Sequence, residues 1–224
     1  MPGITRVHAN DTCRLVPSRF PSTGILDQVA SPEDLPFLFE LESWSNDRIS
    51  AEFGILHRIP REEWVTGRAM SSVVMAAYCH PRPGGGRFNL DDRGAWYAGL
   101  DLDTAHAEVI YHRGVELDEI AVRDTRLEMR LYLANFDADF SDVRARTREH
   151  QPLHDPASYT ASQAFARELL AQEANGVIYR SVRHASGECL ACFRPRLVRN
   201  VRAGAHFEYR WSGRGRPLVR RMKG

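Results

Sequence analysis

Three residues suited to nucleotide-sugar chemistry follow one another closely in this chain. Arg87 lies in a glycine-rich run at residues 84–89, Tyr97 follows 10 positions later, and Glu108 follows after another 11. Glycines let a backbone approach a ligand closely, and a guanidinium suits phosphate oxygens. An aromatic ring offers a flat face, and a carboxylate stabilises positive charge that develops on a sugar. The pattern therefore indicates chemistry on a nucleotide sugar.

The same residues also fit two purely structural interpretations. The glycine-rich run is typical of a hairpin turn that carries a solvated Arg87, and Glu108 suits the exposed face of an amphipathic helix. His112 lies one helical turn beyond Glu108. It either orients the carboxylate or is a histidine with satisfied hydrogen bonds. Spacing alone leaves these alternatives open.

Hydrophobic periodicity and capping residues predict the elements that must position these side chains. Glu108 belongs to a helix over residues 103–112 that is capped by Asp101 or Asp103, and Tyr97 belongs to a strand over 94–98. Further helices are expected over residues 31–47, 71–78 and 159–175, the last capped by Thr160 or Ser162 and ended by Asn175 and Gly176. Further strands are expected over residues 54–60, 116–136, 177–183, 188–193 and 206–211. Two turns that contain proline are expected near the start of the chain, over residues 16–22.

Length and composition predict one α+β domain. The 224 residues suit a single large domain, and no repeat or linker divides them. We divide the chain into an N-terminal segment at 1–60, a core at 61–212 and a basic tail at 213–224. The formal net charge of +1 argues against a purely electrostatic nucleic-acid binder. We interpret the basic tail as solvated rather than as a specific anion or partner site.

The chain lacks several strong motifs. No run of about 18 apolar residues and no signal-peptide pattern is present, so a cytoplasmic protein is expected. Cys189 and Cys192 have CxxC spacing, but no second pair or histidine stands at zinc-ribbon distance, which favours structural thiols and no metal. The glycine run matches neither a phosphate loop nor a dinucleotide fingerprint, and no nucleophile elbow occurs.

Five ordered segments resemble the RES domain family, whose members are known as toxins of RES–Xre toxin–antitoxin pairs. The resemblance covers most of the chain, from about Arg14 to Trp211, and rests on the order of the segments rather than on one motif. The segments lie at residues 13–21, 85–89, 95–98, 105–112 and 176–193.

The resemblance implies a fold akin to ADP-ribosyltransferases, with mixed sheets and flanking helices, and an activity that consumes NAD. Carried over by position, Arg87 would bind the NAD phosphates or ribose, and Tyr97 would lie against nicotinamide. Glu108 would hold the ribose hydroxyl and stabilise an oxocarbenium-like state. His112 and Ser181 match further polar site positions of the family.

One arginine of the family pattern is ambiguous in this chain. Arg14 occupies the better motif position, and Arg19 and Arg58 are credible substitutes for contacting NAD. Phe88 stands where many relatives have Trp, which leaves the turn plausible.

The resemblance implies a cytoplasmic toxin that cleaves the nicotinamide–ribose bond of NAD and has an Xre-like antitoxin as its partner. Transfer of ADP-ribose to a protein target is the first expectation. Transfer to phosphate or water, which would deplete NAD, is the alternative. A catalytically silent, antitoxin-binding RES module is a further alternative. The family pattern does not identify the target or the oligomeric state.

Overall fold

The computed structural model describes residues 2–20, 24–28, 56, 58–213 and 215–223. The helix expected at 31–47 lies outside the described residues. The strand expected at 54–60 lies partly outside them, and its described end at 58–60 forms a turn and a bend. That part of the prediction is wrong, because Pro60 leads directly into a short 3₁₀ helix.

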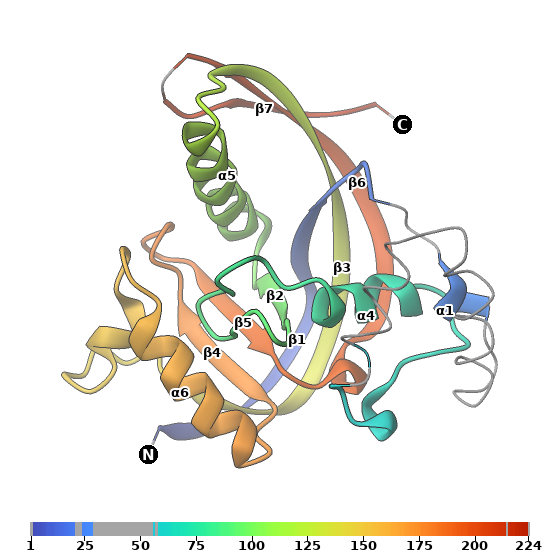
Figure 1. Cartoon of the computed structure of the whole chain (residues 1–224), viewed down its shortest axis with the longest axis vertical. Helices are drawn as coiled ribbons and strands as arrows, with labels where there is room; N and C mark the ends of the chain where they lie inside the picture. The colour runs from blue at the N-terminus through green and yellow to red at the C-terminus, as the bar shows by residue number, and fades with distance from the viewer. Residues whose placement is uncertain (1, 21–23, 29–55, 57, 214, 224) are drawn as a thin grey trace.

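Long curved strands and three longer helices make up the described fold (Figure 1). The helices are α1 (Ile25–Gln28), α4 (Ser71–Cys79), α5 (Leu102–Glu119) and α6 (Thr160–Ala171), with 3₁₀ helices η1 (Arg61–Glu63), η2 (Gln151–His154) and η3 (Pro195–Leu197). The strands are β1 (Gly3–Pro17), β2 (Trp96–Gly99), β3 (Asp124–Asp142), β4 (Gly176–Arg180), β5 (Glu188–Cys192), β6 (Arg199–Ser212) and β7 (Leu218–Arg221).

The described strands form one mixed sheet of seven in the order β1-β2-β5-β4-β3-β6-β7. An additional pairing of β1 with β3 closes five of these strands into a ring, from which β6 and β7 extend. The β3–β4 pair is parallel, and the other pairs are antiparallel. The single α+β domain expected from the sequence is confirmed.

Strand β1 is an element that the sequence analysis missed. Only proline turns were expected near its end, yet the strand pairs with β3 from Gly3↔Asp142 to Pro17↔Met129. A register shift occurs between Ala9 and Thr12, where Asp11 has a φ of 60°. The prediction failed because pairing with β3, rather than local propensity, gives these residues their extended conformation.

Several boundaries also differ from the predicted ones. Helix α5 continues to Glu119, so residues 116–119 are helical and the next strand begins only at Asp124. Helix α6 has no side-chain N-cap and ends at Ala171. Asn175 and Gly176 are therefore not its cap, and Gly176 instead begins β4.

The basic C-terminal segment includes a short strand that the sequence analysis did not predict. Residues Leu218–Arg221 form β7, which pairs with β6. The arginines at 216, 220 and 221 are nevertheless exposed, as expected for a solvated segment. Backbone pairing with β6 and the packing of Val219 against the third apolar cluster hold this edge.

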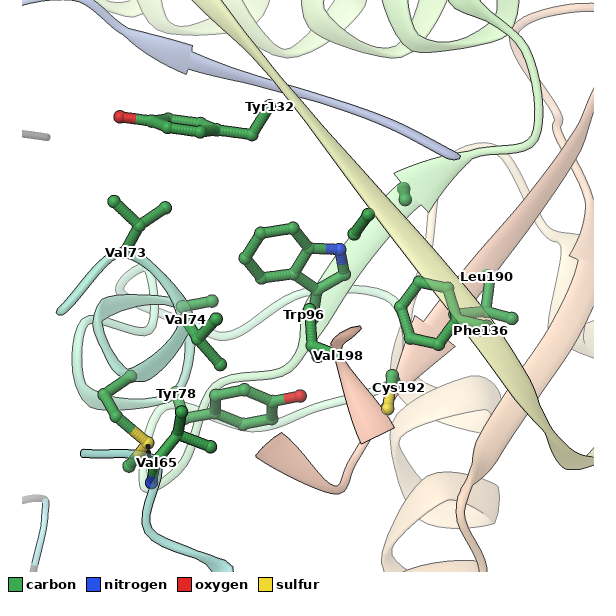
Figure 2. Packing of buried hydrophobic residues seen from close by; sticks show 14 of the residues in the cluster. Val65, Val73, Val74, Tyr78, Trp96, Tyr132, Phe136, Leu190, Cys192 and Val198 are labelled. Carbon is green, nitrogen blue, oxygen red and sulfur yellow. Dashed lines mark hydrogen bonds between the residues drawn. The ribbon is translucent and has the colours of Figure 1, made fainter. Parts of the chain in front are cut away.

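Three apolar clusters form the core of the described residues, and each is covered by a different helix. The first lies between α4 and the strand ring, the second between α6, β4 and β5, and the third between α5, β3 and β6. Figure 2 shows the first cluster, in which Trp96 of β2 lies between side chains of α4 and Phe136 of β3. Trp96 has no exposed surface.

Truncating Phe140 tests the first cluster. Phe140 is 1% exposed and packs edge-on against Phe136, with 6.0 Å between the ring centroids. We expect Phe140→Ala to lower the free energy of unfolding by about 3–5 kcal/mol, because it leaves a cavity in a closed ring of strands. Urea denaturation measures the change. Ile4→Ala is the control, because Ile4 is 77% exposed on β1. A loss no larger than that of the control would contradict this packing.

Candidate functional site

A cavity of about 230 Å³ lies where the three apolar clusters meet. Strands β1 and β2, helix α5 and the glycine-rich run all contribute to its wall. Five residues singled out from the sequence line it together: Arg14, Arg87, Tyr97, Glu108 and His112.

The glycine-rich run is a fixed loop on one wall of this cavity. Gly84 and Gly85 each have a φ of +76°, and a Cβ on Gly85 would lie 2.2 Å from the Asn89 carbonyl oxygen. Glycine is therefore required at position 85. From α6, Gln163 Nε2 donates to the carbonyls of Gly84, Gly86 and Asn89 at 2.8, 3.1 and 3.3 Å. The loop is a turn, as one interpretation held, but α6 covers it.

Arg87 is buried rather than solvated, at 7% exposure. Its Nη1 donates to the carbonyl oxygens of Leu153 and Asp155 at 3.0 and 2.8 Å, and its guanidinium lies 4.7 Å from the ring centroid of Tyr159. Its Nη2 is buried with no hydrogen-bond partner in the protein. A buried unpaired donor is costly, so Arg87 is suited to an anionic ligand in the cavity.

Tyr97 presents its ring to the cavity while its hydroxyl holds the loop. The hydroxyl donates to Asn89 Oδ1 and accepts from the Phe88 amide, both at 2.8 Å. Burial raises the pKa of this hydroxyl, so the side chain is a neutral phenol. Phe88 in turn packs edge-on against Tyr179 of the second cluster, and this contact anchors the loop to the core.

Glu108 projects from the first half of α5. Of the two predicted caps, Asp101 is the one that begins the helix, and its Oδ1 accepts from the Thr104 amide at 2.7 Å. The side chain of Glu108 is 24% exposed, and its Oε1 accepts from Ser181 Oγ at 2.6 Å. Cys189 Sγ lies 3.8 Å from the same oxygen. The carboxylate is therefore oriented within the cavity and does not lie on a solvated helix face.

Ser181 contacts Glu108 and lies outside the described cavity wall. It is 7% exposed and follows directly after β4. Its Oγ accepts from the amides of Arg183 and His184, both at 3.0 Å, while it donates to Glu108. These bonds fix the direction of the hydroxyl, and through it the direction of the Glu108 carboxylate.

His112 lies beside Glu108, with its Nε2 at 3.8 Å from Glu108 Oε2. Its Nδ1 lies 3.0 Å from Nη1 of Arg82. Burial, followed by the charges of Arg82 and Arg183, lowers the pKa of His112 to about 4. The imidazole is therefore neutral at neutral pH.

Of the three early arginines, Arg14 lines the cavity. Its Nη1 donates to the Tyr97 carbonyl at 3.1 Å, and its guanidinium lies 4.9 Å from the Trp96 ring centroid. Burial lowers its pKa to about 10, which leaves it charged at neutral pH. Arg19 and Arg58 are both exposed and lie outside the cavity wall.

The cavity wall carries far more positive than negative charge. Arg14, Arg82, Arg87 and Arg113 line it, and Glu108 is the single carboxylate in the described wall. The positive charge of such a wall attracts an anionic ligand. Glu108 places a negative charge beside one part of that ligand. Arginine forks suit phosphate oxygens, and the Tyr97 ring supplies a flat apolar face.

Sequence reasoning missed several residues of this site. They are Arg82, Arg113, Tyr159, Gln163 and the loop-anchoring role of Asn89. Arg82 stands between two prolines just before the glycine run, and that position was the available signal. The other residues lack such a signal, because only the tertiary fold brings them to the cavity.

Cys189 and Cys192 lie in different environments, as the alternation of a strand predicts. Cys189 faces Glu108, whereas Cys192 belongs to the first apolar cluster and donates to the Arg194 carbonyl. All four cysteines are buried free thiols. Among the described residues, no helix combines the length and hydropathy needed to cross a membrane.

Known proteins resemble this chain in sequence and in fold. The chain is 26% identical over 203 residues to the uncharacterized protein y4oC of Sinorhizobium fredii, which covers 89% of this chain and 82% of that protein. A solved structure, the M. tuberculosis MbcT–MbcA toxin–antitoxin complex, aligns with a TM-score of 0.47 at 11% identity, covering 91% of this chain and 86% of that one. The family model described as the RES domain matches residues 55–212, more than half of the sequence, so the protein belongs to the RES domain family.

Proposed function

We propose that the protein cleaves NAD at the nicotinamide–ribose bond. The observation that carries this proposal is the placement of Glu108, oriented by Ser181, in a cavity whose wall otherwise carries arginines and the ring of Tyr97. Membership of the RES domain family supports it.

The arginines account for binding of the substrate. The pyrophosphate of NAD is anionic, and Arg87 has a buried terminal nitrogen free of protein partners. Arg14 adds a second cation to the cavity wall and also fixes β2 through the Tyr97 carbonyl. The ring of Tyr97 provides the face for nicotinamide, with a cation–π contribution of roughly 0.5–2 kcal/mol.

The carboxylate accounts for the chemistry. Cleavage of the bond develops positive charge on the ribose, and a fixed carboxylate stabilises that state more than the ground state. Nicotinamide is a neutral leaving group once the bond breaks, so the reaction needs little acid catalysis. This matches a site in which His112 is neutral and Tyr97 keeps its proton.

We propose a protein as the acceptor of ADP-ribose, and a cytoplasmic toxin role with an Xre-like antitoxin as partner. The support for the toxin role and the partner is family membership. Phosphate or water as acceptor, and a silent binding module, remain outcomes of the experiments below.

Removing the charge of Glu108 tests the catalytic proposal. We expect the parent to release nicotinamide from NAD and Glu108→Gln to do so about 100-fold to 1000-fold more slowly, because an electrostatic partner of the transition state is lost. Chromatography of free nicotinamide measures the rate. Glu119→Gln, an exposed residue of the same helix, is the matched control and should behave as the parent. No release by the parent would identify a silent binding module.

The fate of ADP-ribose tests the acceptor. We expect mass spectrometry of a cell extract incubated with the protein and NAD to show proteins that gain ADP-ribose. ADP-ribose 1-phosphate or free ADP-ribose as the main product, without modified protein, would contradict transfer to a protein and identify phosphorolysis or hydrolysis.

Two substitutions of Tyr97 separate its ring from its hydroxyl. Tyr97→Phe keeps the ring and breaks the bonds to Asn89 and Phe88, so we expect a loss of about 1–3 kcal/mol in stability with most turnover retained. Tyr97→Ala also removes the ring and should lower kcat/KM for NAD at least about 10-fold. Thermal unfolding and nicotinamide release measure the two effects. Equal activity of both variants would contradict a role for the ring.

A further inference from the structure

Arg82 makes two charge-assisted contacts at the edge of the cavity. It follows α4 and precedes the glycine-rich run. Its Nη1 lies 3.0 Å from Nδ1 of His112, and its Nη2 lies 2.9 Å from Oε1 of Glu116. Arg113 binds the other oxygen of Glu116. Glu116 therefore fixes the guanidinium of Arg82 against α5.

The contact with Arg82 determines where the proton of His112 lies. A guanidinium has only N–H donors, so Nδ1 of His112 must accept and cannot itself carry a proton. In a neutral imidazole the proton then lies on Nε2. This nitrogen is the one that faces Oε2 of Glu108 at 3.8 Å.

Glu108 is therefore approached by two donors from different elements. Ser181 donates to Oε1 from the end of β4, and His112 directs its Nε2–H toward Oε2 from the next turn of α5. The distance of 3.8 Å exceeds that of a hydrogen bond, so the interaction of His112 with Glu108 is an electrostatic contact across one helical turn.

We propose that Arg82 is a positioning residue that holds His112 as its neutral Nε2–H tautomer, so that His112 and Ser181 together orient the carboxylate of Glu108. The functional consequence rests on the proposed cleavage of NAD, whereas the tautomer itself does not.

The charges around His112 come from several elements. Arg82 and Arg87 approach from the segment around the glycine run, Arg183 from the loop after β4, and Arg113 from α5 itself. Glu108 faces the imidazole as the opposing charge. Because its pKa in the folded protein lies near 4, below the ordinary 6.5, His112 binds a proton only as the pH falls through that value. Removing a nearby cation raises this pKa.

The test uses ¹⁵N-histidine-labelled protein and long-range ¹H–¹⁵N spectra, with the signal of His112 assigned through His112→Gln. In the parent we expect an unprotonated Nδ1 from pH 5 to 8. In Arg82→Met, which keeps an aliphatic stem and removes every donor, we expect mixed tautomers and a titration midpoint shifted toward 6.5. Arg82→Lys should restore the parent tautomer in part. Arg220→Met, at an exposed position of β7, is the control.

Kinetics supply the second measurement. We expect kcat for nicotinamide release at pH 7 to fall about 10-fold in Arg82→Met, as for loss of one oriented hydrogen bond to a charged group, with a smaller change in KM for NAD. The activity of this variant should fall further as the pH decreases through the raised pKa of His112, because an imidazolium would neutralise Glu108. The parent should lack this inflection above pH 5.

The outcomes distinguish this inference from the proposed function. A protonated Nδ1 in the parent, or an unchanged tautomer and titration in folded Arg82→Met, would overturn the role of Arg82 even in an active enzyme. A loss confined to KM would assign Arg82 to substrate binding and overturn it as well. Absence of nicotinamide release by the parent would instead overturn the proposed reaction and leave the tautomer result to stand by itself.

Discussion

The site depends on β2, a strand of four residues whose alternate side chains belong to different parts of the molecule. Trp96 enters the first apolar cluster, while Tyr97 points to the opposite face and lines the cavity. The strand pairs with β5 along its whole length and with β1 at Cys13↔Gly99. Arg14 fixes it further through the Tyr97 carbonyl and the Trp96 ring. Because successive residues of a strand face opposite sides, burial of the tryptophan positions the tyrosine.

Several polar side chains of the cavity wall are hydrogen-bonded to other groups of the protein. Three side chains of the wall have partners that fix their directions: Tyr97 has Asn89, Glu108 has Ser181, and His112 has Arg82. Such preorganisation avoids reorientation of dipoles during a reaction, which is a large part of how enzymes stabilise charge. The exceptions in the described wall include Nη2 of Arg87 and Nε of Arg113, which are buried without a hydrogen-bond partner in the protein.

The sequence predicts the elements that carry strong local signals. The Asp101 cap, the helix that bears Glu108 and the strand that bears Tyr97 all have such signals, and the structure contains them. Strand β1 was missed because its pairing with β3 joins residues more than a hundred positions apart. Arg82 was missed for a similar reason, since a lone arginine between prolines acquires a partner only when α5 folds beside it.

Helix α5 carries Glu108, His112 and Glu116 at successive four-residue steps, and all three take part in the polar contacts described above. Each added residue turns an α-helix by about 100°. A single insertion between positions 108 and 116 would thus rotate the later residues away from these polar contacts while leaving the helix intact. Substitutions on the outer face of α5 would leave these contacts in place. The number of residues between Glu108 and Glu116 is therefore more tightly constrained than the identity of the exposed residues of this helix.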